Sequence, residues 1–375
     1  MNWKHSSFFF ALLFCTVNAS NVAKISPKVL IISMFGPEES VWHNIPEFDI
    51  LAKNITVQGL SPLFPYVHCT EDETICQLIT GEGEINAAST LASFIHSPRF
   101  DLCKTYFLIA GIAGINPKVA TIGSVTFARY AVQVCLQFEI DAREMPAGFS
   151  TGYFPFGTTA PGQYPQIIYG TEVFELNENL RQCAFQFAKA AEPQLNDTLA
   201  SAAVRARYGA DSQYAAATMP PVIELCDTAT SDTFWHGRLL AEGFENTTRL
   251  FTNGSATYCT SQEEDNATLN SLMRGALMGL VDFSRIVIMR SGANFDRPPP
   301  GEDAVTFLTG PAPGFEPSLR NLYVAGVKVV EGIIAGWQTT FDQGVKPTNY
   351  IGDIFGSLGG EPDFGPDTQT ANGRV

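Results

Sequence analysis

Residues 261–298, SQEEDNATLNSLMRGALMGLVDFSRIVIMRSGANFDRP, decide the predicted fold of this chain. After an acidic entry, apolar residues recur at three- and four-residue spacing over 267–283, which predicts a long helix. The short apolar run 285–290 then predicts a strand that is covered on both faces. A helix that leads into such a strand is typical of an α/β sheet.

Polar residues lie at both ends of this unit. In open α/β sheets, ligands bind beyond the carboxyl ends of the strands. We therefore expect Gly292, Asn294 and Asp296, which follow the predicted strand, to line a ligand site. Acidic and amide residues would reach the same site from the helix start: Glu263, Glu264, Asp265 and Asn266. The alternative is an ordinary helix–strand unit whose polar ends are solvated caps.

The remaining chain repeats this alternation of elements. Buried strands are predicted at 28–35, 75–80, 106–110, 123–130 and 220–226, and helices at about 86–95, 173–191 and 319–341. No repeat or convincing linker divides them. We predict one α/β domain over residues 20–355, with a single mixed sheet, three layers and helices on both faces. Residues 356–375, rich in Gly, Pro, Asp and Thr, are predicted to be a flexible tail.

The composition narrows the functional classes. The chain has 375 residues and a formal charge of −15, which argues against a nucleic-acid groove because phosphate binding needs clustered Lys and Arg. Residues 1–19 predict a cleaved signal peptide: Lys4 precedes a short apolar run, and small residues precede a cut after Ala19. No later segment offers the about 18–20 uninterrupted apolar residues that a membrane-spanning helix needs. A secreted or cell-surface protein is expected.

An exported protein can carry glycans and disulfides. Sequons that predict surface glycans begin at Asn54, Asn196, Asn246 and Asn253, whereas Asn266-Ala-Thr is expected to stay bare because it lies in the site. Seven cysteines remain after the predicted cut, and Cys69 with Cys76 closes a plausible short loop. The odd number leaves at least one thiol unpaired. No Cys or His spacing indicates a metal, and no cofactor is expected.

Several turns could contribute to a site. Glu38 and Glu39 open an acidic helix start after Pro37, where they match the helix dipole as a cap or serve chemically. Gly111 and Gly114 let the backbone approach a ligand closely. Phe234 or Trp235 could stack on a planar ligand, although Ser231 or Asp232 could instead simply cap a helix that begins near Phe234. The aromatic segment 145–169 is either a packed surface loop or part of a pocket wall.

Four motifs in order carry a resemblance to a known family: TGEGEINAA (80–88), IAGIAGINPKVATIGSV (109–125), TSDTFWHG (230–237) and the pair EEDNAT…RSGANFD (263–296). The chain resembles the purine nucleoside permeases of fungi and bacteria over about residues 28–340. That family in turn distantly resembles the nucleoside phosphorylases and nucleosidases. The resemblance implies purine nucleosides as ligands, and it alone implies a homo-oligomer.

The resemblance also implies roles for single residues. Asn294 occupies the position that reads the purine, with Asp296 as a rival, and Phe234 fits the aromatic that packs on the base. Glu264 or Asp265 would accept hydrogen bonds from the ribose hydroxyls, because Asn266 stands where the family motif has glutamate. Gly111 and Gly114 match the glycine loop beneath the ribose.

Two departures from the superfamily pattern bear on the reaction. Phosphorylases hold phosphate with arginines on the first-strand loop and the glycine-loop strand, and these places carry no basic residue here. Nucleosidases carry a glutamate on the first loop that activates water, which Glu38 or Glu39 resembles. The sequence therefore predicts hydrolysis of purine nucleosides to base and ribose. A non-catalytic nucleoside-binding protein that supports uptake is the main alternative, and phosphorolysis is a second.

Overall fold

The structure is a computed structural model that describes residues 23–362 and residue 364. The predicted signal peptide (1–19) lies outside these residues, as do residue 363 and residues 365–375 of the predicted tail. Phe364 itself is buried between Tyr130 and Tyr350.

Within the described residues, one mixed sheet of 13 strands runs through the centre of the molecule. Its main path follows the order β15-β10-β7-β12-β13-β5-β1-β4-β3-β2, and β14 pairs with β5 and β6, which in turn pairs with β11. The strands are β1 Val29–Ser33, β2 Lys53–Thr56, β3 Tyr66–Cys69, β4 Ile75–Ile79, β5 Tyr106–Ile115, β6 Val125–Ala128, β7 Tyr130–Gln133, β10 Val173–Glu175, β11 Ile223–Leu225, β12 Asp227–Thr230, β13 Tyr258–Gln262, β14 Ile286–Phe295 and β15 Gly352–Asp353. A separate antiparallel pair is formed by β8 Phe138–Glu139 and β9 Tyr153–Phe154, of which β9 lies in the aromatic segment 145–169.

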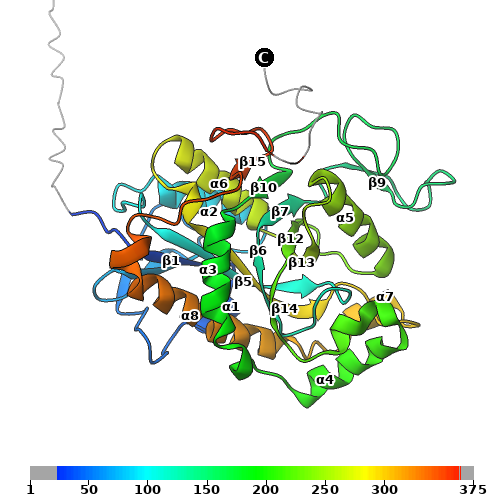
Figure 1. Cartoon of the computed structure of the whole chain (residues 1–375), viewed down its shortest axis with the longest axis horizontal. Coiled ribbons are helices and arrows are strands. Elements are labelled where there is room, and N and C mark those ends of the chain that lie inside the picture. The colour runs from blue at the N-terminus through cyan, green and yellow to red at the C-terminus, as the bar shows by residue number, and fades with distance from the viewer. Residues whose placement is uncertain (1–22, 363, 365–375) are drawn as a thin grey trace, which may run out of the picture.

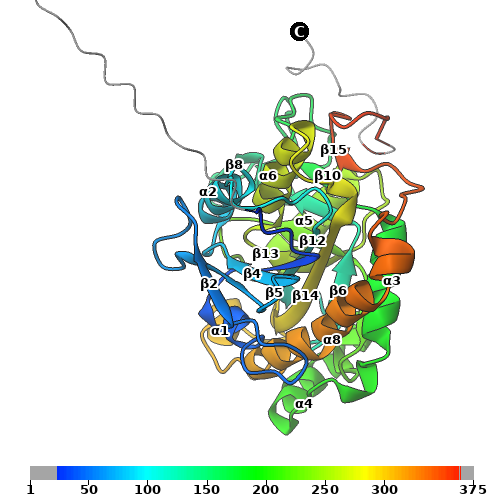
Figure 2. The same ribbon diagram turned by 90° about the vertical axis from the view of Figure 1, so that its left-hand side faces the viewer.

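Helices cover both faces of this sheet (Figures 1 and 2). They are α1 Gly36–Ser40, α2 Glu84–Ile95, α3 Glu178–Lys189, α4 Leu199–Ala206, α5 Arg238–Phe251, α6 Asp265–Leu277, α7 Ala304–Leu308 and α8 Phe315–Ala335. Helices α2 and α6 pack together, and so do α3 and α8.

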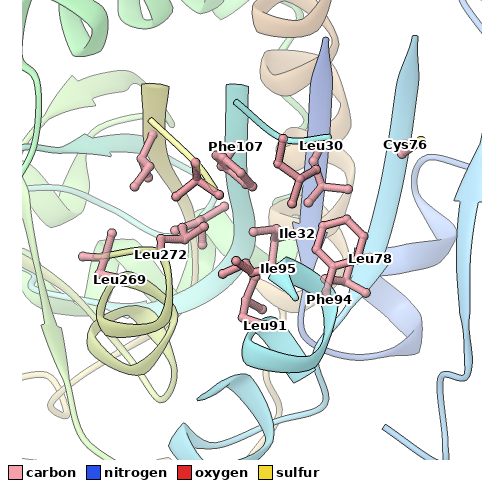
Figure 3. Close-up of a cluster of buried hydrophobic side chains, with 14 of the residues drawn as sticks. Leu30, Ile32, Cys76, Leu78, Leu91, Phe94, Ile95, Phe107, Leu269 and Leu272 are labelled. Atoms are coloured by element: carbon pink, nitrogen blue, oxygen red, sulfur yellow. The ribbon is translucent and has the colours of Figure 1, made fainter. Parts of the chain in front are cut away.

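The alternation of side chains along β1 separates the two faces. Leu30 and Ile32 join a core cluster with Phe94 of α2 and Leu272 of α6, part of which Figure 3 shows. Val29 and Ile31 of the same strand join a second cluster with α3 and α8. Because successive strand residues point to opposite faces, these pairs of helices lie on opposite sides of the sheet. The predicted single mixed-sheet α/β domain with three layers is confirmed.

Several predicted boundaries are wrong. The helix predicted at 267–283 runs from Asp265 to Leu277, because Gly279 adopts a positive φ of 70° and Leu280 N–H returns to the Gly275 carbonyl. The segment predicted as a helix from 173 begins as strand β10, and the Asn177 side chain caps α3.

The strand predicted at 285–290 continues to Phe295, so Gly292 and Asn294 lie in β14 and not in a loop after it. The polar end of β14 pairs in parallel with residues 111–115 of β5, which satisfies its backbone. The predicted strand ended at the last residue of the apolar run, but hydrogen bonds to β5 extend the strand through the polar residues that follow. Helix α5 also begins later than predicted, at Arg238, and Gly237 is its N-cap in place of Ser231 or Asp232.

Covalent and surface features agree with several expectations. The Cys69–Cys76 disulfide is confirmed, and Cys226 is bonded to Cys259. Among the described cysteines, three are unpaired: Cys103, Cys135 and Cys183. The four predicted glycan sites are exposed, whereas Asn266 is buried. No helix in the described part of the chain is long and apolar enough to cross a membrane.

Candidate functional site

A cavity of about 170 Å³ lies at one end of the sheet, where β1, β5, β13 and β14 approach the start of α6. The chain leaving β1 contributes Glu38, β5 contributes Gly114, and β14 contributes Arg290 and Asn294. The loop after β12 adds Phe234 as a further wall. One cavity at the ends of these strands thus brings together side chains from distant parts of the sequence.

Glu38 is the acidic residue that the fold positions most tightly in this cavity. Its side chain is 2% exposed, and its two carboxyl oxygens accept hydrogen bonds from the backbone N–H groups of Met34 (2.8 Å) and Ile112 (2.6 Å). Burial raises the pKa of Glu38 from 4.5 to about 8; Glu264 adds to the shift, while Arg290 and the two backbone donors oppose it. A carboxylate offers about four acceptor positions, so each oxygen keeps capacity for another partner.

Glu39, the other predicted catalytic residue, does not line the cavity. Its carboxylate lies 3.2 Å from Nε2 of His68 and 3.7 Å from Nε2 of His43. Neighbouring residues at a helix start point about 100° apart, and here Glu38 faces the cavity while Glu39 faces the two histidines. Glu39 therefore lies outside the cavity, and its catalytic role stays a prediction that this geometry does not support.

Arg290 lines the cavity, although the sequence did not single it out as a site residue. The guanidinium is 1% exposed and bonds to Asp265 at 2.6 Å and 3.3 Å and to Glu264 at 3.4 Å. Burial alone would lower its pKa, but Asp265, Glu264 and Glu38 raise it overall, so it stays charged. An Arg at the end of a buried apolar run could have identified this residue from the sequence, because buried arginines need carboxylate partners.

The acidic segment before α6 divides between two roles. Glu263 and Glu264 line the cavity, and Glu264 also accepts from Gly83 N–H at 3.1 Å. Burial, together with Glu264 and Glu82, raises the pKa of Glu263 to about 7. Asp265 is fully buried and accepts a hydrogen bond from Arg290, so its role as a ribose ligand stays a prediction that this geometry does not support.

Asn266 does not line this cavity either. Its amide accepts from the Thr230 hydroxyl at 2.6 Å and donates to the Thr171 carbonyl at 2.7 Å. It thereby ties the start of α6 to its neighbours, and its prediction as a ligand residue is not supported. The register of the acidic motif is set by α6, which begins at Asp265 and turns Glu263 and Glu264 toward the cavity.

The two predicted base readers are also separated by the structure. Asn294 lines the cavity, and its Nδ2 donates a long bond of 3.3 Å to the Phe295 carbonyl. Asp296 is fully buried outside it, where it binds Arg297 at 2.7 Å and 2.9 Å and accepts from the Tyr258 hydroxyl at 2.7 Å. Asp296 is thus bonded within the protein outside the cavity, and its role as the base reader stays a prediction that this geometry does not support.

Both predicted glycines are required by close contacts. A Cβ at Gly111 would lie 2.5 Å from Arg290 Nη1 and 2.8 Å from Glu38 Oε1, and one at Gly114 would lie 2.5 Å from Ser261 Oγ. Gly114 lines the cavity, whereas Gly111 does not line it and leaves room for the side chains of Arg290 and Glu38.

The predicted aromatic wall is partly present. Phe234 lines the cavity and is 59% exposed, so its ring is available at the entrance. Trp235 also lines it, but most of its ring packs on Phe244 and Tyr258. The segment 145–169 does not contribute to the cavity; it packs its own aromatics and borders a separate hollow beside α5.

A second cavity of about 320 Å³ adjoins the first. The two cavities share six of their lining residues: Phe35, Glu82, Ile112, Phe234, Ala293 and Asn294. The second cavity is otherwise mainly apolar and is closed by α7 and the segment before α8. Binding sites for small molecules usually measure about 300–1,000 Å³, so the two cavities together match such a site better than the first alone.

Known proteins are similar to this chain over most of its length. The profile of the family described as "Purine nucleoside permease (NUP)" matches residues 26–346. A purine nucleoside permease of Candida albicans (strain SC5314) is 45% identical over 348 residues, which are 91% of this chain and 84% of that protein. A probable purine nucleoside permease of Schizosaccharomyces pombe is 42% identical over 323 residues, 83% of this chain and 90% of that protein.

Solved structures give weaker likenesses. A 5′-methylthioadenosine/S-adenosylhomocysteine nucleosidase from Neisseria meningitidis is 15% identical, with a TM-score of 0.47 over 83% of this chain and 98% of that one. A futalosine hydrolase of Helicobacter pylori is also 15% identical, with a TM-score of 0.46 over 82% and 97%. Similarity at this level does not bear on the reaction. The family profile and the two sequence relatives show that this chain belongs to the purine nucleoside permease family.

Proposed function

We propose that this protein is an exported purine nucleosidase, which hydrolyses the N-glycosidic bond to give free base and ribose. The observation that supports this most is Glu38. A buried carboxyl group that is fixed by two backbone donors, lines a cavity and has a pKa near 8 has the properties of a general base. Binding alone would not require such a group.

The chemistry uses one water molecule. Ionised Glu38 takes a proton from this water as its oxygen attacks C1′ of the ribose. The C1′–N9 bond breaks, its electron pair leaves with the base, and the base takes up a proton from solvent. Departure of the base builds positive charge on the ribosyl ring, which the neighbouring carboxylate of Glu264 stabilises.

The charges of the cavity disfavour phosphorolysis. Its described lining includes four acidic residues, Glu38, Glu82, Glu263 and Glu264, and Arg290 as its one basic residue. Arg290 already binds Asp265 through two hydrogen bonds. A phosphate dianion would therefore meet mainly like charge and few free donors.

The remaining residues suit the two halves of a nucleoside. Glu263 and Glu264 supply acceptors for the ribose hydroxyl protons. Asn294 provides both a donor and an acceptor for a purine edge, and Phe234 supplies a ring face.

A binding protein without catalysis is the second candidate, and Asn294 is the observation that favours it. An amide cannot deliver a full proton to the departing base as an acid could, so the site can hold a purine without assisting its departure. Such a protein would capture nucleosides and pass them to a membrane carrier.

Product analysis separates these functions. The purified protein is incubated with inosine, guanosine or adenosine, with and without phosphate, and base, ribose and ribose 1-phosphate are measured. Hydrolysis predicts base and ribose without phosphate, and kcat/KM that rises about tenfold per pH unit below pH 8 and then levels off, because Glu38 must be ionised. Measurable binding with no product would refute hydrolysis in favour of the binding protein, and product that needs phosphate would refute both.

Glu38→Gln tests the assignment of the base within that assay. Loss of a general base lowers kcat by about 10²–10⁴-fold, while nucleoside affinity is kept. The matched control is Glu39→Gln, which removes the neighbouring carboxylate outside the cavity and should retain turnover. If Glu38→Gln retains full turnover, the proposed mechanism is wrong.

Export is proposed on the predicted signal peptide, and the exposure of the four sequons supports it. N-terminal sequencing of protein from the natural host should find a chain that begins at Ser20, and glycosidase treatment should lower its mass. A mature chain that begins at Met1 would contradict export by this route.

A further inference from the structure

The second cavity contains a histidine whose surroundings the proposed function leaves unexplained. His236 lines this cavity, both of its ring nitrogens are buried, and neither makes a hydrogen bond of good geometry with the described residues, although the Phe295 backbone lies near the ring. Burying polar atoms without partners costs free energy, and such groups in a cavity indicate a ligand or water. Burial lowers the pKa of His236 and favours the neutral imidazole, although the charge of Asp296 and a backbone hydrogen bond with Phe295 oppose this shift. A neutral imidazole offers one donor and one acceptor.

The position of His236 is fixed from both sides. Its ring stacks on Phe307 of α7 with centroids 5.6 Å apart and planes 15° apart. The next residue, Gly237, has a φ of 123° and donates its N–H to the Asp296 carbonyl at 2.9 Å, which joins this loop to the end of β14. Asp296 is itself held by Arg297 and Tyr258. The imidazole therefore belongs to a rigid wall.

The two cavities differ in chemistry. The first holds Glu38, Glu263, Glu264 and Arg290, which suit a group with several hydroxyls. The second is lined by aromatic, aliphatic and proline side chains, with Glu82, His236 and Asn294 as its polar side chains. Burial of flat apolar faces with a few directed polar contacts is what a heteroaromatic ring requires. Asn294 borders both cavities and lies at the junction.

We infer that the second cavity is the base subsite, and that His236 is a base-recognising residue that hydrogen-bonds an edge of the purine while the ribose occupies the first cavity. This inference rests on the proposed binding of purine nucleosides, and it does not depend on whether the bound nucleoside is hydrolysed. Phe307 supports the imidazole from behind, and Asn294 contacts the ligand where base and sugar join.

Calorimetric titration of the full chain with hypoxanthine, and with inosine in the Glu38→Gln background so that the nucleoside is not consumed, tests the assignment. His236→Phe keeps a ring against Phe307 but removes both nitrogens, and it should weaken both ligands about tenfold, the worth of one net hydrogen bond. Glu264→Gln is the matched variant on the sugar side; it should weaken inosine and leave hypoxanthine unchanged. Wild-type affinity of His236→Phe for hypoxanthine would overturn the inference, as would loss of hypoxanthine binding in Glu264→Gln alone, or no binding of either ligand in the absence of these two substitutions.

A second measurement does not depend on the folding of a variant. The chain has five histidines, so ¹⁵N-histidine labelling resolves their ring nitrogens by NMR. Hypoxanthine should shift the His236 nitrogens, and unchanged shifts at saturation would overturn the inference. Binding through His236 without turnover would refute the hydrolase and leave the base subsite intact, whereas turnover with an unperturbed His236 would do the reverse.

Discussion

Replacement of Glu38 by glutamine should change how the stability of this protein depends on pH. The folded pKa of about 8 lies above the value of 4.5 for the unfolded chain. Below about pH 4.5 the carboxyl group is protonated in both states and does not lower the free energy of unfolding. As pH rises above 4.5, the unfolded state is increasingly favoured because the group ionises there first, and this loss of stability levels off near pH 8, where the group also ionises in the folded state. A shift of roughly 3.5 units at 1.36 kcal/mol per unit corresponds to about 5 kcal/mol.

The pH dependence can be separated from the other effects of the substitution. Glutamine has one carbonyl oxygen, so either the Met34 or the Ile112 N–H loses its acceptor, at a cost of about 1–3 kcal/mol that does not vary with pH. From the two pKa values, the penalty of the native carboxyl group is about 1 kcal/mol at pH 5 and about 5 kcal/mol at pH 9. The free energy of unfolding of Glu38→Gln relative to the native protein should therefore rise by about 4 kcal/mol over this range.

Urea denaturation at pH 5, 7 and 9, followed by circular dichroism, measures this difference. Glu224→Gln is the control, because it removes an exposed carboxylate from a strand without any change in burial. A difference between Glu38→Gln and the native protein that is constant from pH 5 to pH 9 would refute the reasoning, since it would mean that the Glu38 carboxyl group does not titrate in a buried environment.

Three further substitutions test other parts of the structure. Arg290→Met leaves Asp265 and Glu264 buried without their cation and should lower the free energy of urea unfolding by about 3–5 kcal/mol, so a loss below about 1 kcal/mol would contradict the buried ion pair. Gly111→Ala places a methyl group against Arg290 and Glu38 and should weaken inosine binding at least about tenfold by calorimetry; native affinity would show that the contact is not tight. Cys69→Ser opens the short disulfide loop and should cost about 2–3 kcal/mol by urea unfolding, whereas Cys103→Ser, at an exposed free thiol, should cost little; equal losses would contradict the bond.

The fold class was predictable because it depends on patterns that are local in the sequence. The apolar runs that became β1, β4, β5 and β14 are short and continuous, as buried strands must be, and α2, α6 and α8 show helical spacing. Even the Cys69–Cys76 pair could be found, since its sulfurs lie on paired strands separated by a short turn. Element ends were less predictable: Gly279 and Asn177 act through backbone geometry, which residue periodicity does not contain.

The site was predictable only to the level of segments. The residue pattern and the family resemblance identified the acidic stretch before α6, the end of β14, the glycines of β5 and the first-strand loop, and residues from each of these segments, with Gly114 as the glycine, line one cavity in the structure. Sequence alone could not choose between Glu38 and Glu39 or between Asn294 and Asp296, because side chains one or two residues apart differ mainly in direction.

Only the tertiary structure decided those directions. Arg290 directly follows the apolar residues 286–289 of β14. Its partner Asp265 is 25 residues away in the sequence, so the ion pair exists only when β14 and α6 pack together. That pair removes Asp265 from the ligand site and leaves Glu264 facing it. His236 likewise stood out only in the structure, where α7 and the end of β14 pack against it beside a cavity. Spacing along the chain determines which elements form, whereas long-range packing and charge pairing determine which polar side chains remain for a ligand.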